Sequence, residues 1–185
     1  MRFKTQLEAF NTVSGVMCAS RHNYSVVNRD TKIGGTRAIP LFLSRADFER
    51  AMRVLEQGPL FEVMVLRSAK VGILVTGTEV FQGLIQDSFI PIVRHKVERF
   101  ECQVVETIIV PDDQAAIAQG VRRILDAGAD LIVTTAGLSV DPDDVTKQGL
   151  IDAGVTDMLS GMPILPGAMT LIARIGEVQV IGVPA

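Results

Sequence analysis

The chain has few of the features that mark secreted, metal-binding or membrane proteins. Its 185 residues include two cysteines, Cys18 and Cys102, and neither has a second cysteine or a histidine at metal-ligand spacing. A disulfide framework and a zinc site are therefore disfavoured, and two buried thiols are predicted. Apolar runs such as VGILV and DLIVTT are far shorter than the roughly 20 residues of a membrane helix. No charged-then-apolar signal segment opens the chain, so we expect a cytoplasmic protein without a membrane partner.

The sequence also lacks the P-loop of many nucleotide-binding proteins and the basic stripe of nucleic-acid-binding proteins. No G-x-x-x-x-G-K-[ST] segment occurs, which excludes a P-loop. Residues 1–69 hold ten Lys and Arg against six Asp and Glu, whereas residues 70–185 hold eight against fifteen. Binding to a nucleic-acid backbone needs a basic stripe, and the acidic second part argues against it. The difference in charge predicts two parts with different surfaces.

The second part, residues 70–185, alternates short β-branched runs with amphipathic runs. VGILVTG, CQVVETIIV and DLIVTT are typical of buried strands, and IQDSFIPIVRHKVERF and QAAIAQGVRRILDAG have helical spacing. A third helix is expected from Val145 to Ala153. Strands that are apolar throughout are covered on both faces. The pattern predicts an α/β fold of three layers, with a mostly parallel, doubly wound sheet.

The first part, residues 1–69, has a different pattern. TVSGVMCAS, YSVVN and KIGGTRAIPLFLS are short β-type runs separated by turn residues. SRADFERAMRVLEQG begins with a capping serine and has apolar residues at Phe48, Met52 and Leu55, which predicts a helix. We expect a small β-rich N-terminal unit with one helix. Because the chain stops within the strand-like run VQVIGVPA, we also expect the second domain to be truncated at its C-terminus.

Carboxylates lie in each loop that follows a predicted strand of the second part. TGTEVFQG, VPDD and TAGLSVDPDD come after the first, second and third strands. In doubly wound sheets the loops at the strand C-termini meet in a ligand crevice. Asp141, Asp143 and Asp144 would repel one another there. They indicate either a bound ligand or metal, or a loop that is merely solvated.

Three spaced motifs resemble the molybdopterin-binding domain family of molybdenum cofactor biosynthesis proteins. They are VTGTEVFQGLIQDSF, IIVPDD and LIVTTAGLSVDPDDVT, and they occur in the family's order. ILPGA and VIGVPA resemble the proline-glycine turns of its molybdotransferase branch. The resemblance covers about residues 70–185. It implies a ligand, molybdopterin or adenylyl-molybdopterin, and a homo-oligomer, either dimer or trimer. The implied chemistry is AMP transfer from ATP, as in an adenylyltransferase, or molybdate insertion with release of AMP.

The same resemblance assigns site residues. The expected ligand-binding residues are Thr76, Gly77, Glu79, Ser88, Asp112, Thr134, Thr135, Gly137, Ser139, Thr146, Pro166 and Gly167. The expected catalytic carboxylates are Asp87, Asp143 and Asp144, of which Asp143 and Asp144 would also hold Mg²⁺.

Local chemistry agrees with such a ligand. Gly137 allows close approach of the main chain, and the helix that begins near Asp144 directs free N–H groups at a phosphate. The amino and ring N–H groups of a pterin suit a carboxylate, with Asp87 as the first candidate and Asp112 or Asp113 as the second. Helix capping is the alternative role for Asp112 and Asp113.

Two alternatives to a molybdopterin transferase stay open. The sequence also leaves open whether the protein is an enzyme. Ala136 stands where the family has a glycine, and Phe89 stands where it has an asparagine. These changes favour a non-catalytic carrier or sensor of molybdopterin. A nucleotide pyrophosphatase of the competence-damage-protein type shares a similar glycine-aspartate loop and would cleave ADP-ribose instead.

Overall fold

The protein is described by a computed structural model over residues 2–135 and 145–184. The chain divides into two compact units, Met1–Val65 and Leu66–Ala185. Each unit builds its own hydrophobic core. Among the described residues, no helix combines the length and apolarity needed to cross a membrane.

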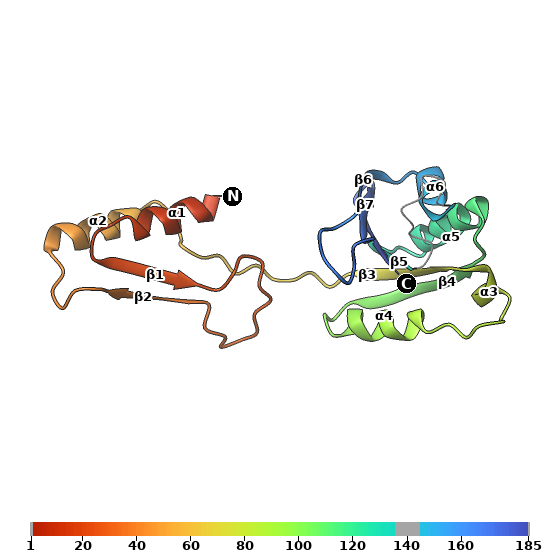
Figure 1. Ribbon diagram of the computed structural model, residues 1–185, viewed down its shortest axis with the longest axis horizontal. Coiled ribbons are helices and arrows are strands. Elements are labelled where there is room, and N and C mark those ends of the chain that lie inside the picture. The colour runs from red at the N-terminus through yellow and green to blue at the C-terminus, as the bar shows by residue number, and fades with distance from the viewer. Residues whose placement is uncertain (1, 136–144, 185) are drawn as a thin grey trace. The chain divides into compact units, whose positions relative to one another are not determined.

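The first unit packs two helices on one side of a two-stranded sheet. In order, its elements are α1 (Arg2–Asn11), β1 (Val16–Ser20), β2 (Gly34–Ala38) and α2 (Arg45–Glu56), and the two strands are antiparallel (Figure 1). Phe10, Cys18 and Ala51 form its small buried core. The prediction of one helix was wrong, because α1 is a second helix, and its Leu7 and Phe10 pack in the core of the unit.

The predicted strand YSVVN, residues 24–28, is also absent; these residues are described and form a turn followed by irregular backbone. Tyr24 and Asp30 have φ angles of 61° and 65°, which are incompatible with extended backbone. The loop is closed instead by a hydrogen bond of 2.8 Å from the Arg21 N–H to the Ile33 carbonyl.

The capping serine of α2 is present as predicted. The Ser44 hydroxyl accepts a hydrogen bond of 3.1 Å from the Asp47 N–H, which satisfies one free donor of the first turn. Ala51 faces the core of the unit. The side chains of Phe48, Met52 and Leu55, in contrast, are exposed.

The second unit holds a six-stranded sheet with the spatial order β4-β3-β5-β8-β7-β6. Its strands are β3 (Lys70–Thr76), β4 (Gln103–Val110), β5 (Leu131–Thr135), β6 (Thr156–Ser160), β7 (Leu171–Ile175) and β8 (Val178–Val183). The pairs β3–β4, β3–β5 and β5–β8 are parallel, whereas β8–β7 and β7–β6 are antiparallel. The sheet is therefore mostly parallel with an antiparallel extension at one side.

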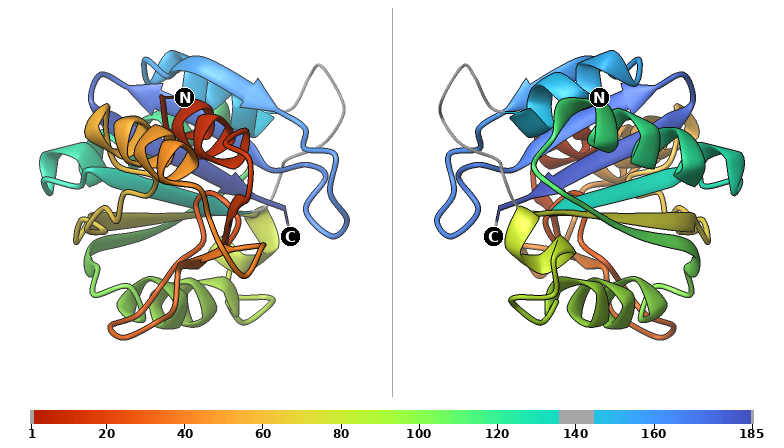
Figure 2. Two further views of the ribbon diagram at one scale, coloured as in Figure 1. Left: turned by 90° about the vertical axis from the view of Figure 1, so that its left-hand side faces the viewer. Right: turned by 90° about the vertical axis from the view of Figure 1, so that its right-hand side faces the viewer.

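Helices on both faces make the unit three-layered. α4 (Phe89–Glu98) covers one face of β3 and β4, and α5 (Gln114–Asp126) and α6 (Val145–Asp152) lie on the opposite face (Figure 2). The core on the α4 side contains Val71, Ile73 and Val133. The core on the other side includes Leu74 and Ile117. Alternate residues of each central strand thus enter opposite cores, which explains their continuous apolar runs.

Two glycines allow α5 to pack closely. A Cβ added at Gly72 of β3 would lie 2.0 Å from Cγ2 of Ile124, which is fully buried on α5. A Cβ at Gly149 of α6 would lie 2.7 Å from the Cβ of Ile117. Both positions therefore need a residue without a side chain.

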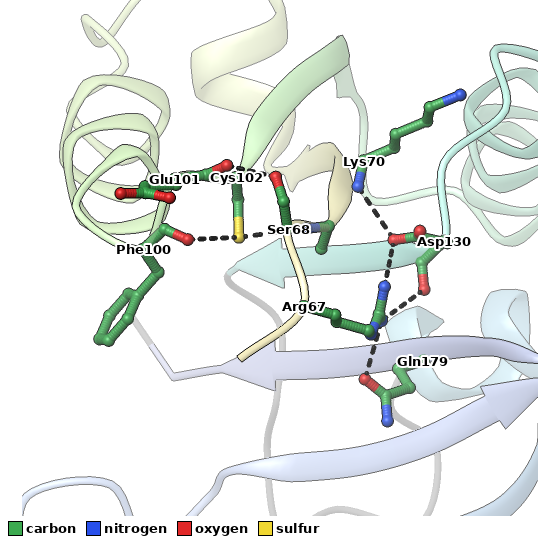
Figure 3. A network of polar contacts seen from close by, with 9 residues as sticks. Arg67, Ser68, Lys70, Phe100, Glu101, Cys102, Asp130 and Gln179 are labelled. Carbon is green, nitrogen blue, oxygen red and sulfur yellow. Dashed lines mark hydrogen bonds and ion pairs between the residues drawn. The ribbon is translucent and has the colours of Figure 1, made fainter. Parts of the chain in front are cut away.

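A polar network fixes the entry into β3, at the sheet edge where the parallel strands begin (Figure 3). Arg67 forms an ion pair of 2.8 Å with Asp130 and donates a hydrogen bond of 3.1 Å to the Gln179 side chain. The Lys70 N–H donates to the Asp130 carboxylate at 3.0 Å. Asp130 thus links the start of β3 to the segments that lead into β5 and β8.

Gly72→Ala is expected to lower the free energy of unfolding by about 1–3 kcal/mol, the usual cost of overpacking. The new methyl group would lie 2.0 Å from Cγ2 and 3.1 Å from Cβ of Ile124, a fully buried side chain. Chemical denaturation monitored by circular dichroism measures the change. Gly35→Ala is the control, because nothing lies within 4 Å of a Cβ at that position. Equal effects of the two substitutions would contradict the close-packing role of Gly72.

The substitution Asp130→Asn tests the ion pair between Arg67 and Asp130 through the pH dependence of the free energy of unfolding. Burial raises the pKa of the Asp130 carboxyl, but the hydrogen bonds from Arg67 and the Lys70 N–H and the charge of Arg67 lower it by more. The pKa therefore lies below the ordinary value of 3.8, so ionised Asp130 stabilises the fold above that pH.

The wild type should exceed Asp130→Asn in stability at pH 7 by about 1 kcal/mol or less, because the pair is half-exposed. The difference should vanish as the pH falls through the lowered pKa. Urea unfolding at a series of pH values measures it, and a difference that stays constant into acid would refute this role.

Candidate functional site

The parallel strands end together at one edge of the sheet, which we call the carboxyl edge. Thr76 of β3 lies opposite Val110 of β4, and Thr135 of β5 lies opposite Val183 of β8. The Gly77 N–H donates a hydrogen bond of 3.0 Å to the Val110 carbonyl, which joins the loops after β3 and β4. These loops form the region where the sequence predicted a ligand crevice.

Four buried threonines lie at the carboxyl edge. Thr76 Oγ1 lies 3.3 Å from the Thr135 carbonyl oxygen and 3.4 Å from Thr146 Oγ1 of α6. The hydroxyls of Thr134 and Thr135 are fully buried and have no hydrogen-bond partner among the described residues. Buried hydroxyls without partners are costly, and these two are closed off from solvent, so a further hydrogen bond requires the surrounding chain to move.

Asp112 makes a contact that the sequence did not reveal. Its Oδ2 accepts a hydrogen bond of 3.0 Å from the Thr78 N–H, and its own N–H donates to the Thr78 hydroxyl at 3.2 Å. The pair links the first residue of α3 (Thr78–Phe81) to the loop after β4. Thr78 was not among the predicted site residues, and only its place directly after Gly77 hinted at this role.

The neighbouring carboxylates have separate roles. Asp113 caps α5, because its Oδ1 accepts a hydrogen bond of 2.8 Å from the Ala116 N–H. Capping is thus the role of Asp113, one of the two roles that the sequence left open. Glu79 lies in the first turn of α3 and is exposed.

Asp87 and Ser88 stand at the start of α4. Oδ1 of Asp87 accepts from the Phe89 N–H at 3.0 Å, and Oδ2 accepts from the Ile90 N–H at 3.1 Å. Asp87 therefore precedes the helix and satisfies its free donors. Ser88 is exposed, and its side chain makes no capping hydrogen bond. Since α4 returns the chain from the carboxyl edge to the start of β4, its first turn lies on the side of that edge.

Pro166 and Gly167 belong to the loop between β6 and β7. Leu171, the first residue of β7, lies opposite Gly182 of β8, so this loop also reaches the carboxyl edge. The Leu165–Pro166 peptide is cis, and Gly167 has a φ of 114°. The Gly167 carbonyl accepts hydrogen bonds from the N–H and hydroxyl of Thr170 at 3.0 and 2.7 Å.

The remaining predicted residues lie outside the described part of the chain. These are Gly137, Ser139, Asp141, Asp143 and Asp144, together with Ala136. The described residues contain no group of three or more His, Cys, Asp or Glu side chains that could hold a metal ion. The Mg²⁺ ligands expected at Asp143 and Asp144 thus remain a prediction from the sequence.

Both thiols are free. Cys18 is buried in the first unit, and burial raises its pKa. Cys102 is half-buried, and its Sγ accepts a hydrogen bond of 3.4 Å from the Ala69 N–H next to the network in Figure 3. It lies at the sheet edge opposite the carboxyl edge, away from the candidate site.

Comparisons with known proteins agree with this architecture. The CinA-like protein of Mycobacterium avium (strain 104) is 38% identical over 81 residues, which are 44% of this chain and 19% of that protein. The CinA-like protein of Mycolicibacterium gilvum is 34% identical over 113 residues, which are 60% of this chain and 25% of that protein. The chain therefore spans at most a quarter of the length of these curated relatives.

A solved structure with the same fold is the molybdopterin biosynthesis enzyme MoaB of Thermus thermophilus. It has a TM-score of 0.54 and 23% identity, and the match covers 63% of this chain and 80% of that one. The shared fold confirms the prediction of a three-layer α/β unit.

The family comparison covers a longer part of the chain. The profile of the MoCF_biosynth family, described as "Probable molybdopterin binding domain", matches residues 72–185. This range holds the whole six-stranded sheet except its first two residues, and it holds every predicted site residue. Because the match spans more than half of the sequence, the chain belongs to the MoCF_biosynth family, as its motifs predicted.

Proposed function

We propose that the protein binds molybdopterin or adenylyl-molybdopterin at the carboxyl edge and acts in molybdenum cofactor biosynthesis. The observation that carries this proposal is the pair of buried hydroxyls of Thr134 and Thr135 at the end of β5, which have no partner among the described residues. They precede the loop whose motif the family shares. A ligand with many acceptor atoms, such as a phosphorylated pterin, would use donors of this kind once the chain at the end of β5 moves to expose them.

The contacts between loops support the same site. The Thr78–Asp112 pair and the hydrogen bond from Gly77 to Val110 hold the loops after β3 and β4 in a fixed arrangement. A prearranged loop loses less conformational entropy when a ligand binds. The contacts of Asp112 with Thr78 use Oδ2, so Oδ1 is suited to the amino group of a pterin.

The phosphate end of the ligand would lie at the loop before α6. Asp143 and Asp144 would hold Mg²⁺ between their carboxylates and the phosphate oxygens, which removes the repulsion between the two anionic groups. If the protein catalyses AMP transfer or molybdate insertion, these groups position and neutralise the phosphates.

A second candidate is hydrolysis of the pyrophosphate bond of ADP-ribose to AMP and ribose 5-phosphate. The CinA-like proteins of mycobacteria are among the curated relatives, and the competence-damage-type pyrophosphatases share the glycine-aspartate loop. The same carboxyl edge would bind the two phosphates. Chromatographic detection of AMP after incubation with ADP-ribose separates this activity from pterin binding.

Asp144→Asn should weaken binding of molybdopterin in the presence of Mg²⁺ at least about tenfold, which corresponds to about 1.4 kcal/mol. The substitution removes the charge that would hold the metal ion. Isothermal titration calorimetry with and without Mg²⁺ gives the dissociation constants. Asp126→Asn is the matched control, because Asp126 ends α5 at the opposite side of the unit. An unchanged constant for Asp144→Asn would remove this residue from the site.

Thr134→Val and Thr135→Val make a second test that separates binding from folding. Each change removes a buried hydroxyl that lacks a partner among the described residues, so the free energy of unfolding should stay constant or rise by up to about 1 kcal/mol. Affinity for molybdopterin should fall about tenfold for each hydrogen bond lost. Thermal unfolding and calorimetry measure the two effects. A loss of stability without a loss of affinity would show that the hydroxyls serve the fold alone.

A further inference from the structure

The Thr134 hydroxyl lies on the sheet face that α5 and α6 cover. Thr134 is opposite Leu74 in the pairing of β5 with β3, and residues directly opposite one another share a face. Leu74 packs in the core with Ile117 of α5 and Leu150 of α6. Because Thr134 is 0% exposed, a ligand reaches its hydroxyl only after part of this cover moves.

The helix α5 is fixed to the sheet along its length. A Cβ at Gly72 of β3 would overlap Ile124 of α5, and a Cβ at Gly120 of α5 would lie 2.9 Å from Leu74 of β3, so helix and strand touch at two levels. The Asp113 carboxylate caps the first turn of α5 at 2.8 Å. Moving α5 would therefore open the main core of the unit, which makes it the fixed part of the cover.

The helix α6 is short, and its two halves are held differently. Its second half packs on α5: a Cβ at Gly149 would lie 2.7 Å from the Cβ of Ile117, and the Gln114 amide donates a hydrogen bond of 2.6 Å to the Asp152 carboxylate. Its first turn reaches the sheet through Thr146, which is 1% exposed. The first turn of α6 is therefore the part of the cover that can move while the core stays intact.

The Thr76 hydroxyl holds this first turn. Thr76 Oγ1 donates a hydrogen bond to the Thr135 carbonyl at 3.3 Å and lies 3.4 Å from Thr146 Oγ1. A threonine hydroxyl has one proton to donate, and that of Thr76 is directed at Thr135, so Thr146 is the donor in the second contact. We call these two contacts the threonine latch. It links α6 to β3 and to the end of β5.

The threonine latch is weak, and the closed arrangement carries a cost. Both contacts are longer than the about 2.8 Å of an ordinary hydroxyl hydrogen bond. The closed arrangement also leaves the Thr134 hydroxyl without a partner among the described residues, and solvent would remove that cost on opening. Both effects lower the free energy needed to open the first turn of α6.

We propose that the threonine latch holds the first turn of α6 closed over Thr134, and that the ligand binds when this turn opens while α5 and the sheet stay in place. The ligand is that of the proposed function, on which this inference rests. When a ligand binds the open state alone, its apparent affinity is reduced in proportion to the fraction of molecules that are open. The latch therefore sets the affinity of the site.

The substitution Thr76→Val tests the latch through affinity. Valine keeps the shape of threonine but removes both contacts, so it destabilises the closed state and raises the open fraction. The dissociation constant for molybdopterin with Mg²⁺, measured by isothermal titration calorimetry, should fall about tenfold. Thr76→Ser keeps the hydroxyl and should stay within about twofold of the wild type. Weaker binding by Thr76→Val would show that Thr76 contacts the ligand directly, and an equal change in Thr76→Ser would show that the hydroxyl is irrelevant; either result overturns the latch.

Hydrogen exchange of the ligand-free protein, followed by mass spectrometry, tests the latch without the ligand. Peptides that span α6 should exchange at least about threefold faster in Thr76→Val than in the wild type and Thr76→Ser, and peptides that span α5 should not change. Unchanged exchange in α6 would overturn the latch. A wild type that does not bind molybdopterin would refute the proposed function instead, and the exchange rates would still decide the latch.

Circular dichroism verifies that each variant is folded. If Thr76→Val does not fold, Thr146→Val takes its place in both experiments, because it removes one contact of the latch and leaves the bond from Thr76 to the Thr135 carbonyl. The expected changes then have the same direction, and the same results overturn the proposal.

Discussion

The parallel pairing of β3, β4, β5 and β8 is the constraint on which the rest of the second unit depends. Parallel neighbours must all point the same way, so each connection carries the chain back across a face of the sheet. The helices that do so bury both faces, and the loops after the strands collect at one edge. In this protein, the same pairing that brings Val71 and Ile73 into the core places Thr76, Asp112 and Thr135 at one edge.

The buried and half-buried polar groups at the two ends of the sheet are paired differently. At the amino-terminal end, Asp130 joins Arg67 and the start of β3 through an ion pair and a main-chain hydrogen bond. At the carboxyl edge, the hydroxyls of Thr134 and Thr135 have no partner within the described chain. Proteins concentrate unsatisfied groups where a ligand completes them. The two ends of the sheet therefore differ in whether the described chain satisfies their buried polar groups.

The sequence predicted a strand or a helix cap correctly wherever the residues of that element alone determine its structure. The central strands were predictable because burial on both faces leaves a continuous apolar run, and the caps at Ser44 and Asp113 follow from a short polar side chain before a helix. β6 and β7 were missed because one face of each stays exposed and their apolar residues are interrupted by Asp157 and Arg174. The Thr78–Asp112 pair joins residues 34 positions apart, and a contact of that kind has no local signature.

The loop between β6 and β7 stands apart from the repeated strand-helix units. Because β7 runs antiparallel to β8, it starts where β8 ends, and the loop with the cis Leu165–Pro166 peptide reaches the carboxyl edge from outside the parallel core. Its length and composition can therefore change without disturbing any βαβ crossover. Substitutions and insertions in this loop therefore change the surface beside the ends of β5 and β8 while the scaffold stays the same.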